Sequence, residues 1–545
     1  MRQTFSLEGQ YVNIQERTIC PCRMKVNEGK IQQVIEISKA PDIFIMPGFI
    51  DAHVHIESSL LVPAEFARMA VVHGTVATVS DPHEIANVCG MKGVDFMIRS
   101  GRKVNFKFYF GAPSCVPATP FETSGAIINA QDIAQLLKRE EIHYLAEMMN
   151  WPGVIQGDKG VIEKIRLAQK LGKPIDGHAP GLVGEQALKY AAAGISTDHE
   201  CFQMEEAIHK INLGMIIAIR EGSAAKNFDD LIDLIDHHVD QLMFCSDDKH
   251  PDSLIAGHIN QLVARAVKKG KDLFDVLKVA CLNPIDHYHL QVGRLREGDP
   301  ADFIMVHDLK DFLINKTYIN GELVAENGKT LMKHRPSESI NHFVAQPISR
   351  KDLELRSLGD KAWVIIARDG QLVTEKAVFD IKCEDGLAIG NSEKDILKIA
   401  VINRYDLQPP SIAFIKNFGI QNGAMASSVA HDSHNIIVVG SDDEKMVQAV
   451  NLVIENKGGL SAVNINEAKF LPLPIGGLMS GEDGYKITRQ YIYLDNMVKD
   501  MGSSLQSPYM TLSFMALLVI PEIKLSDKGL FDGKDFKFMD VFTDV

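Results

Sequence analysis

The sequence has few cysteines and no paired cysteine motif. Its eight cysteines are scattered and lack Cys-x-x-Cys spacing, so they indicate neither a disulfide framework nor a thiolate zinc site. No apolar run approaches the roughly 20 residues that a membrane span needs, and the N terminus lacks the apolar segment of an export signal. We therefore expect a protein of the reducing cytoplasm that does not contact a membrane.

Basic tracts are missing as well. The 57 Lys and Arg residues stand against 71 Asp and Glu, for a formal net charge of −14. Because phosphate backbones are bound mainly through clustered basic side chains, nucleic acid is not an expected partner. A nucleobase or another small neutral substrate remains open.

The chain of 545 residues, 46% of them hydrophobic, is long enough for two or three domains. Residues 1–42 and 291–345 show short alternating strands, and we expect them to form one small β-sandwich domain from both flanks of the middle segment. A polar stretch at about 333–350 is predicted to be a linker. Residues 351–545 mix strand-like runs with amphipathic helices such as 442–456, which predicts a C-terminal α+β domain.

The middle segment, residues 43–290, has a different pattern. Short apolar runs that end in polar residues alternate with longer stretches of helical period. Eight strands that alternate with helices over roughly 250 residues predict an α/β fold, a (β/α)8 barrel with its active site at the C-terminal ends of the strands. The expected strands are 43–50, 75–80, 106–111, 142–148, 174–178, 195–199, 215–220 and 241–246.

Potential metal ligands gather at these strand ends. His53 and His55 are two residues apart, so on a strand their side chains point the same way. Random placement would put such residues as often on helices or at strand starts, so their shared position predicts a metal site at one rim of the barrel. The predicted ligands are His53, His55, Glu147, His178, His199 and Asp247.

Four imidazoles with two carboxylates suit a transition metal such as Zn, Mn or Fe. Glu147 stands in an apolar run, where an unpaired carboxylate would be costly to bury, and it is the best residue to bridge two ions. A water held by two cations loses a proton near neutral pH. Asp247 is the best base for that proton, with Asp248 in reserve, and the predicted chemistry is hydrolysis.

Two further motifs allow more than one interpretation. Asp81-Pro82-His83-Glu84 is either a helix N terminus capped by Asp81 or a part of the substrate site. His431-Asp432-Ser433-His434 has metal-like spacing, but it precedes a strand in a separate domain. A loop with no third ligand nearby is the favoured interpretation of this second motif.

These motifs together resemble the amidohydrolase superfamily. The resemblance rests on His-x-His after strand 1, His after strands 5 and 6, Asp after strand 8, and Gly-Asp-Pro-Ala-Asp-Phe at 298–303. Longer sequence motifs around these positions, and the segments 429–435 and 473–480 near the C terminus, resemble the bacterial type of adenine deaminase. The likeness thus covers nearly the whole chain.

The resemblance implies hydrolysis of adenine to hypoxanthine and ammonia in purine salvage, at a binuclear Mn²⁺ or Fe²⁺ centre, with Zn²⁺ as the alternative. It also implies that Glu147 replaces the carboxylated lysine of the hydantoinase and dihydroorotase branch, since the expected strand 142–148 contains no lysine. That difference counts against a cyclic-amide hydrolase, the main alternative. A non-catalytic metal-binding barrel is the other alternative, and a homo-oligomer is expected.

The resemblance leaves the proton donor open. Mononuclear deaminases carry a glutamate a few residues after the strand-5 histidine, but the first one here, Glu185, is seven residues beyond His178. Glu200 or Asp81 is expected to serve instead. We expect the imidazole edge of adenine to be bound by residues such as His83, Glu84 and Glu200, with Asp248 also in the substrate site, which leaves little room for a ribose.

Overall fold

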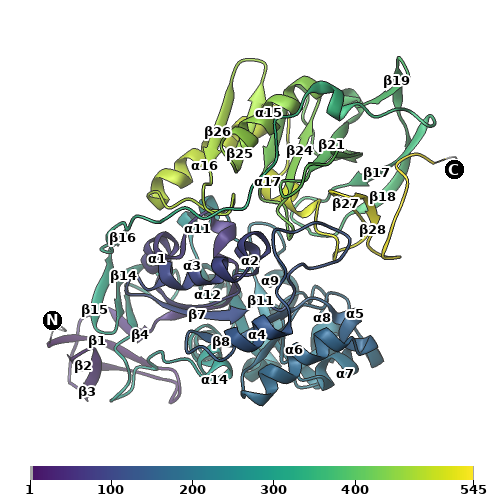
Figure 1. Ribbon diagram of the computed structural model, residues 1–545. Coiled ribbons are helices and arrows are strands. Elements are labelled where there is room, and N and C mark those ends of the chain that lie inside the picture. The colour runs from purple at the N-terminus through teal and green to yellow at the C-terminus, as the bar shows by residue number, and fades with distance from the viewer. Residues whose placement is uncertain (1–3, 544–545) are drawn as a thin grey trace.

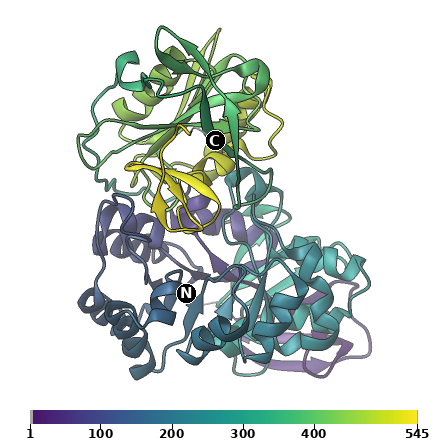
Figure 2. The same ribbon diagram turned by 90° about the vertical axis from the view of Figure 1, so that its right-hand side faces the viewer.

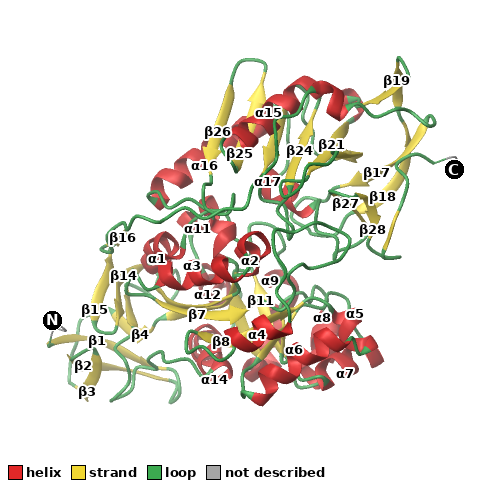
Figure 3. Ribbon diagram, viewed as in Figure 1, coloured by secondary structure: helices red, strands yellow, loops and turns green. Residues whose placement is uncertain are grey.

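The computed structural model describes residues 4–543 and arranges them in three parts (Figures 1 and 3). A small sheet and a helix-wrapped barrel fill the lower half of Figure 1, and a C-terminal domain lies above them. Among the helices of residues 4–543, none is long and apolar enough to cross a membrane.

The small domain is one eight-stranded sheet of order β16-β15-β14-β13-β4-β1-β2-β3. β4 (Phe44–Pro47) joins its two chain segments, because β4 pairs in parallel with β1 and antiparallel with β13. The expected barrel strand 43–50 is therefore wrong in its first half, and the barrel begins at Phe49. The other strands are β1 (Phe5–Asn13), β2 (Thr18–Asn27), β3 (Lys30–Glu36), β13 (Phe303–Val306), β14 (Ile314–Ile319), β15 (Glu322–Glu326) and β16 (Lys329–Thr330).

Eight parallel strands form the predicted barrel, hydrogen-bonded as two sheets, β5-β6-β7-β8-β9 and β10-β11-β12. Backbone hydrogen bonds link the two sheets at both seams. Asp247 N donates to the His53 carbonyl (2.9 Å), and Ser196 N donates to the Ile175 carbonyl (2.9 Å). The strands are β5 (Phe49–Val54), β6 (Thr75–Ser80), β7 (Lys107–Ala112), β8 (Ile142–Met148), β9 (Ile175–Gly177), β10 (Thr197–Asp198), β11 (Ile216–Arg220) and β12 (Leu242–Cys245).

Helices cover the outside of the barrel, and some of them, such as α12, bury a single apolar face. In α12 the buried residues Ile259, Leu262, Val263 and Ala266 recur at i, i+3, i+4 and i+7, which is the spacing of a single helix face. The barrel helices are α1 (Pro63–Ala70), α2 (His83–Cys89), α3 (Met91–Gly101), α4 (Ala130–Leu136), α5 (Trp151–Gln156), α6 (Lys159–Lys170), α7 (Gly184–Ala192), α8 (Met204–Asn212), α9 (Phe228–Leu231), α10 (Ile235–His238), α11 (Pro251–Ala256), α12 (Ile259–Lys268), α13 (Leu273–Leu277) and α14 (Asn283–Tyr288).

The C-terminal domain is built on a second eight-stranded sheet, of order β18-β17-β22-β21-β24-β23-β25-β26. Its helices are α15 (Asp443–Glu455), which matches the predicted helix 442–456, α16 (Gly484–Asp500) and α17 (Pro508–Phe514). The strands are β17 (Lys361–Ile366), β18 (Glu375–Asp380), β19 (Lys382–Glu384), β20 (Leu387–Ile389), β21 (Ile396–Ile402), β22 (Ser411–Lys416), β23 (Gly423–Ser427), β24 (Ile436–Gly440), β25 (Gly459–Asn464), β26 (Ala468–Pro472), β27 (Ile523–Ser526), β28 (Gly529–Asp532) and β29 (Lys537–Phe538).

The C-terminal domain packs directly on the barrel (Figure 2). Ser480 N donates to the Leu60 carbonyl (2.8 Å), and Arg68 of α1 forms an ion pair with Asp483 (2.9 Å) at the start of α16. One continuous cluster of buried apolar side chains includes residues of both domains. The two domains therefore share a core, and the barrel mouth lies at their boundary.

Candidate active site

The first group of side chains comes from the end of β5 and from the residues after β12. His53 Nε2 lies 3.1 Å from His55 Nε2, and Asp247 Oδ1 lies 3.1 Å from His55 Nε2 and 3.6 Å from His53 Nε2. All three side chains are buried. His55 Nδ1 contacts the Asp81 carbonyl at 3.2 Å, which places the ring proton on Nδ1 and leaves the Nε2 lone pair free for a ligand.

A second group lies at the ends of β8, β9 and β10. Glu147 Oε2 is 2.9 Å from His178 Nδ1 and 3.2 Å from His199 Nε2, while its other oxygen, Oε1, is 3.4 Å from His55 Nε2. The two oxygens of Glu147 thus face different histidine groups. Tyr190 supports this arrangement, because its hydroxyl accepts from His178 N (3.0 Å) and donates to the Met148 carbonyl (2.7 Å).

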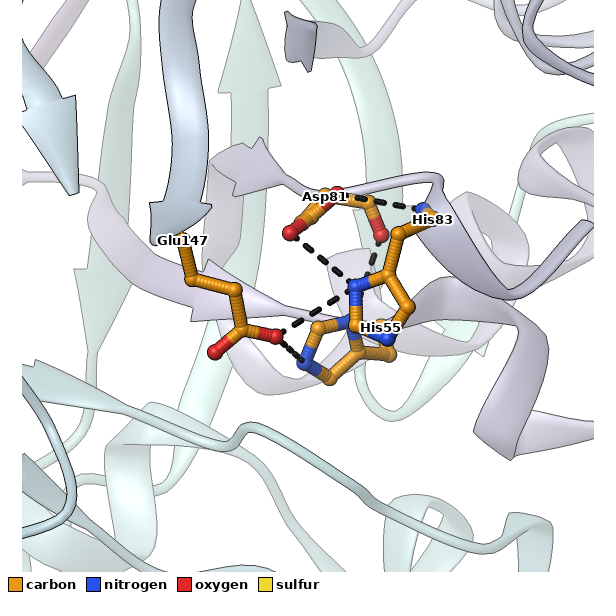
Figure 4. Close-up of side chains that lie close together, drawn as sticks. All are labelled: His55, Asp81, His83 and Glu147. Carbon is orange, nitrogen blue, oxygen red and sulfur yellow. Dashed lines mark hydrogen bonds and ion pairs between the residues drawn. The ribbon is translucent and has the colours of Figure 1, made fainter. Parts of the chain in front are cut away.

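Asp81 and His83 join the same cluster from the end of β6 and the start of α2. In Figure 4 the side chains of Asp81 and His83 lie close to those of Glu147 and His55. His83 Nδ1 is 3.1 Å from Asp81 Oδ2 and 3.3 Å from Glu147 Oε1. α2 begins at His83, and its N-cap position is Pro82, whose side chain makes no capping bond. The amides of the first turn are instead satisfied by neighbouring carboxylates, because Asp81 Oδ1 accepts from His83 N (3.1 Å) and Glu57 Oε1 accepts from Ile85 N (3.2 Å). The expected helix start is therefore correct, and Asp81 caps its first amide from one position before the N-cap.

Arg220, the last residue of β11, is a site residue that the sequence analysis missed. Its guanidinium contacts Asp247 Oδ2 (2.6 Å) and both oxygens of Glu200, one of them at 3.1 Å. Burial alone would raise the pKa of Asp247, but Arg220 and the neighbouring histidines hold that pKa well below its usual range. Burial would also raise the pKa of Glu200, but Arg220, His178 and His199 together lower it below its usual value.

Asp248 and Glu185 have different environments. Asp248 is buried in the pocket, where its carboxylate accepts a hydrogen bond from the Ser58 hydroxyl, and burial raises its pKa. Glu185 is exposed on α7, where it pairs with Lys189 at 3.0 Å. The structure therefore places Glu185 outside the site.

The C-terminal domain contributes His431 and His434 to the site, although the sequence analysis interpreted them as part of a loop in a separate domain. Glu84 of α2 forms hydrogen bonds to both His431 and His434, and the three side chains are buried together. The expectation of a loop with no third ligand nearby is thus wrong. The chain between β23 and β24 folds back onto the barrel mouth. Its contact partner, Glu84, is more than 340 residues away in the sequence, so no local pattern predicted the contact.

The pocket at the centre of these residues is small, with a volume of about 20 Å³. Its C-terminal wall consists of Leu372, His431, Asp432, Phe514 and Leu517. A larger cavity of about 580 Å³ lies beside it, and Glu200 and Leu372 line both cavities. The barrel side of the small pocket is lined by His55, His83, Glu84, Glu147, Met149, His178, His199, Glu200, Asp247 and Asp248.

The donor atoms fit divalent metal ions. The ligating atoms lie within 4.8 Å of one another in several groups, among them His53-His55-Asp247 and His53-Glu147-His199. Imidazole nitrogen and carboxylate oxygen in one buried cluster are the ligands of Zn, Mn and Fe. His199 Nε2, which faces Glu147 Oε2 at 3.2 Å, has no hydrogen-bond partner within residues 4–543, so the described chain alone does not satisfy this imidazole.

Comparison with known proteins agrees with this arrangement. Residues 44–324 match the amidohydrolase family, and residues 371–537 match the adenine deaminase C-terminal domain. The adenine deaminase of Salinibacter ruber is 53% identical over 100% of both chains, and that of Methanosarcina mazei is 51% identical over 95% of this chain and 96% of its own.

Among solved structures, the β-aspartyl dipeptidase of Fervidobacterium islandicum AW-1 aligns with 60% of this chain and 98% of its own, with 16% identity and a TM-score of 0.45. The fold and the family assignment rest on the strand topology and on the full-length relatives. The chain belongs to the adenine deaminases of the amidohydrolase superfamily.

Proposed function

We propose that the protein hydrolyses adenine to hypoxanthine and ammonia, as a step of purine salvage. The observation that carries this proposal is the convergence of four histidines (His53, His55, His178 and His199) with Glu147 and Asp247 in one buried cluster, in a chain with full-length relatives named adenine deaminase. The eight cysteines are all free, which supports action in a reducing cytoplasm.

We further propose that two divalent cations, Mn²⁺ or Fe²⁺ in preference to Zn²⁺, are held by these ligands. His53, His55 and Asp247 would bind one ion, His178 and His199 the other, and Glu147 would serve both. When bound, such ions lower the pKa of water and supply the hydrolytic nucleophile near neutral pH.

Asp247 has the position for the proton transfers of the reaction. One of its oxygens faces His53 and His55, and the other is held by Arg220. Addition of water at C6 of adenine makes that carbon tetrahedral, so one proton must leave the water and another must reach the departing amine. Asp247 would accept the first and deliver it to the amine, while Arg220 keeps the carboxylate oriented.

The ring nitrogen needs a second proton donor. Glu200 is held as an anion by Arg220, which suits it to orienting Arg220 rather than to giving up a proton. Asp81, in contact with His83 beside Glu147, is the better candidate. In its protonated form it would give its proton to the ring nitrogen, and it would regain one from the hydroxyl at C6 as that group becomes the carbonyl of hypoxanthine. His83 and Glu84 would then contact the purine from the same side of the pocket.

The test is ammonia release from adenine by the purified chain, beside hydantoin and dihydroorotate as cyclic-amide substrates. Chelation should abolish turnover of adenine, and Mn²⁺ or Fe²⁺ should restore it. Ring opening of a cyclic amide without adenine turnover would refute the proposed substrate. Full activity in a preparation that elemental analysis shows to be metal-free would refute the metal-dependent mechanism.

A further inference from the structure

The segment His431–His434 of the C-terminal domain carries polar atoms that the catalytic roles above do not use. His431 and Asp432 both line the small pocket together with the metal-ligand candidates of the barrel. Their side chains are only 2% and 3% exposed. Polar side chains buried to this degree are normally satisfied by hydrogen bonds, so their partners indicate their role.

The two histidines are oriented by one carboxylate. His434 Nδ1 accepts from Ala430 N (3.3 Å), which leaves Nε2 protonated to donate to Glu84. His431 Nδ1 faces the other oxygen of Glu84, and a carboxylate only accepts, so the proton of His431 lies on Nδ1. The ring of His431 also stacks on Phe514, with centroids 4.9 Å apart and an interplanar angle of 25°.

This orientation leaves two buried polar atoms without partners. In the part of the chain that the structure describes, His431 Nε2 and Asp432 Oδ2 have no hydrogen-bond partner, although both atoms are buried. Although burial would lower the pKa of His431, the carboxylates of Glu84, Asp248 and Asp432 raise it to about 9, so Nε2 also carries a proton and is a donor, whereas the Asp432 carboxylate offers only lone pairs. A buried polar atom without a partner is unfavourable by roughly 1–3 kcal/mol, and a ligand that offers an acceptor to His431 and an N–H to Asp432 would remove that penalty.

We propose that His431 and Asp432 are substrate-binding residues, of which His431 donates a hydrogen bond to a ring nitrogen of the purine and Asp432 accepts one from its ring N–H. His434 is a positioning residue that acts through Glu84. The free base carries a ring N–H on its imidazole edge, and a nucleoside has a ribose there instead. The C-terminal domain would thus select the free base. This inference rests on the proposed deamination of adenine.

The different roles of the two ring nitrogens make a sharp test possible. An Asn side chain places its amide near the Nδ1 position of a histidine, and a Gln places it near Nε2. His431→Asn therefore keeps a donor for Glu84 and removes the donor at Nε2. For His434, Gln keeps the donor toward Glu84, and Leu removes it.

The measurements are kcat and KM for adenine, 7-methyladenine and 9-methyladenine, the metal content, and calorimetric binding of hypoxanthine. We expect His431→Asn and Asp432→Asn to weaken hypoxanthine binding and lower kcat/KM for adenine, each by roughly tenfold, at unchanged metal content. In Asp432→Asn, the preference for adenine over the methylated base that lacks the recognised N–H should shrink by a similar factor. His434→Gln should retain more activity than His434→Leu.

The control is His342→Asn, at an exposed histidine of the linker that contacts the Gly125 carbonyl of the barrel (3.1 Å) but does not line the pocket. Binding and methyl-base discrimination in His431→Asn and Asp432→Asn equal to those of His342→Asn would overturn the inference. Wild-type protein that releases no ammonia from adenine would instead refute the proposed function, so the two failures are distinguishable.

Discussion

Lys189 and Lys210 each form an ion pair within one helix, but one pair is exposed and the other is buried. Each pairs with a glutamate four residues earlier, Glu185 on α7 and Glu206 on α8. The side chains of Lys189 and Glu185 are 54% and 77% exposed, whereas those of Lys210 and Glu206 are 0% and 3% exposed. The same substitution at the two lysines therefore compares a surface ion pair with a buried one.

Lys210 has two more partners, both next to site histidines. Its ammonium contacts Asp198 (2.7 Å), which precedes His199, and the carbonyl of Ala179 (2.6 Å), which follows His178. Although burial would raise the pKa of Asp198, Lys210 lowers it below its usual value, so Asp198 is an anion. Replacing Lys210 with Met leaves this buried anion without a counter-ion.

Removal of one partner from a buried ion pair destabilises a protein by roughly 3–5 kcal/mol, whereas an exposed i,i+4 pair contributes about 0.3–0.5 kcal/mol. For a unit of the barrel's size, 1 kcal/mol shifts the Tm by about 2–4 °C. Lys210→Met should therefore lower the Tm of the barrel by roughly 6–20 °C, and Lys189→Met by no more than about 2 °C.

The assay is calorimetric unfolding with chelator present, because bound metal would add its own stabilisation and mask the difference. Adding Asp198→Asn to Lys210→Met should recover part of the loss, since it removes the buried charge. A Tm of Lys210→Met within about 2 °C of Lys189→Met would refute the reasoning, since the buried network would then contribute no more than a surface pair.

Further variants test the proposed roles. Glu147→Gln should lower the metal content per chain as well as the rate, and unchanged stoichiometry by elemental analysis would show that Glu147 does not bridge the ions. Asp247→Asn should nearly abolish deamination while adenine still binds by calorimetry; an active variant would move the base to Asp248. Wild-type kcat/KM should be far higher for adenine than for adenosine, and comparable values would mean that the pocket is open at N9. Burial lowers the pKa of Lys524 to about 7, so between that pH and the unfolded value of about 10.4 the unfolded chain binds more protons and stability should rise with pH. Urea unfolding at pH 7 and 9 should show this rise in wild type relative to Lys524→Met, and an equal response of both proteins would contradict it.

The barrel was predictable because its strands are short apolar runs with polar residues at one end. Arg220 also fits this pattern, since it is the last residue of the expected strand 215–220. A guanidinium is not a metal ligand, however, so the pattern of metal-ligand residues did not include it. The split at Gly48 was not predictable, because β4 and β5 together form one apolar run, and only their pairing partners assign them to different sheets.

The role of His431 and His434 was also beyond the sequence analysis. Their contact with Glu84 joins residues 347 and 350 positions apart in the chain, and no local pattern reports such a pairing. The spacing of the motif was noticed, but its third partner comes from another domain. Contacts between domains depend on how whole surfaces fit, which hydrophobic periodicity does not encode.

The smallness of the pocket has a consequence for turnover. A space of about 20 Å³ holds about one water molecule, and a purine does not fit in it. Leu372 and Glu200 line both this pocket and the neighbouring cavity of about 580 Å³, so displacement of the Leu372 side chain would join the two spaces. Adenine can then bind only when the pocket opens, and hypoxanthine can leave only when it opens again. The rate of opening therefore sets an upper limit on kcat, however fast the C–N bond is cleaved.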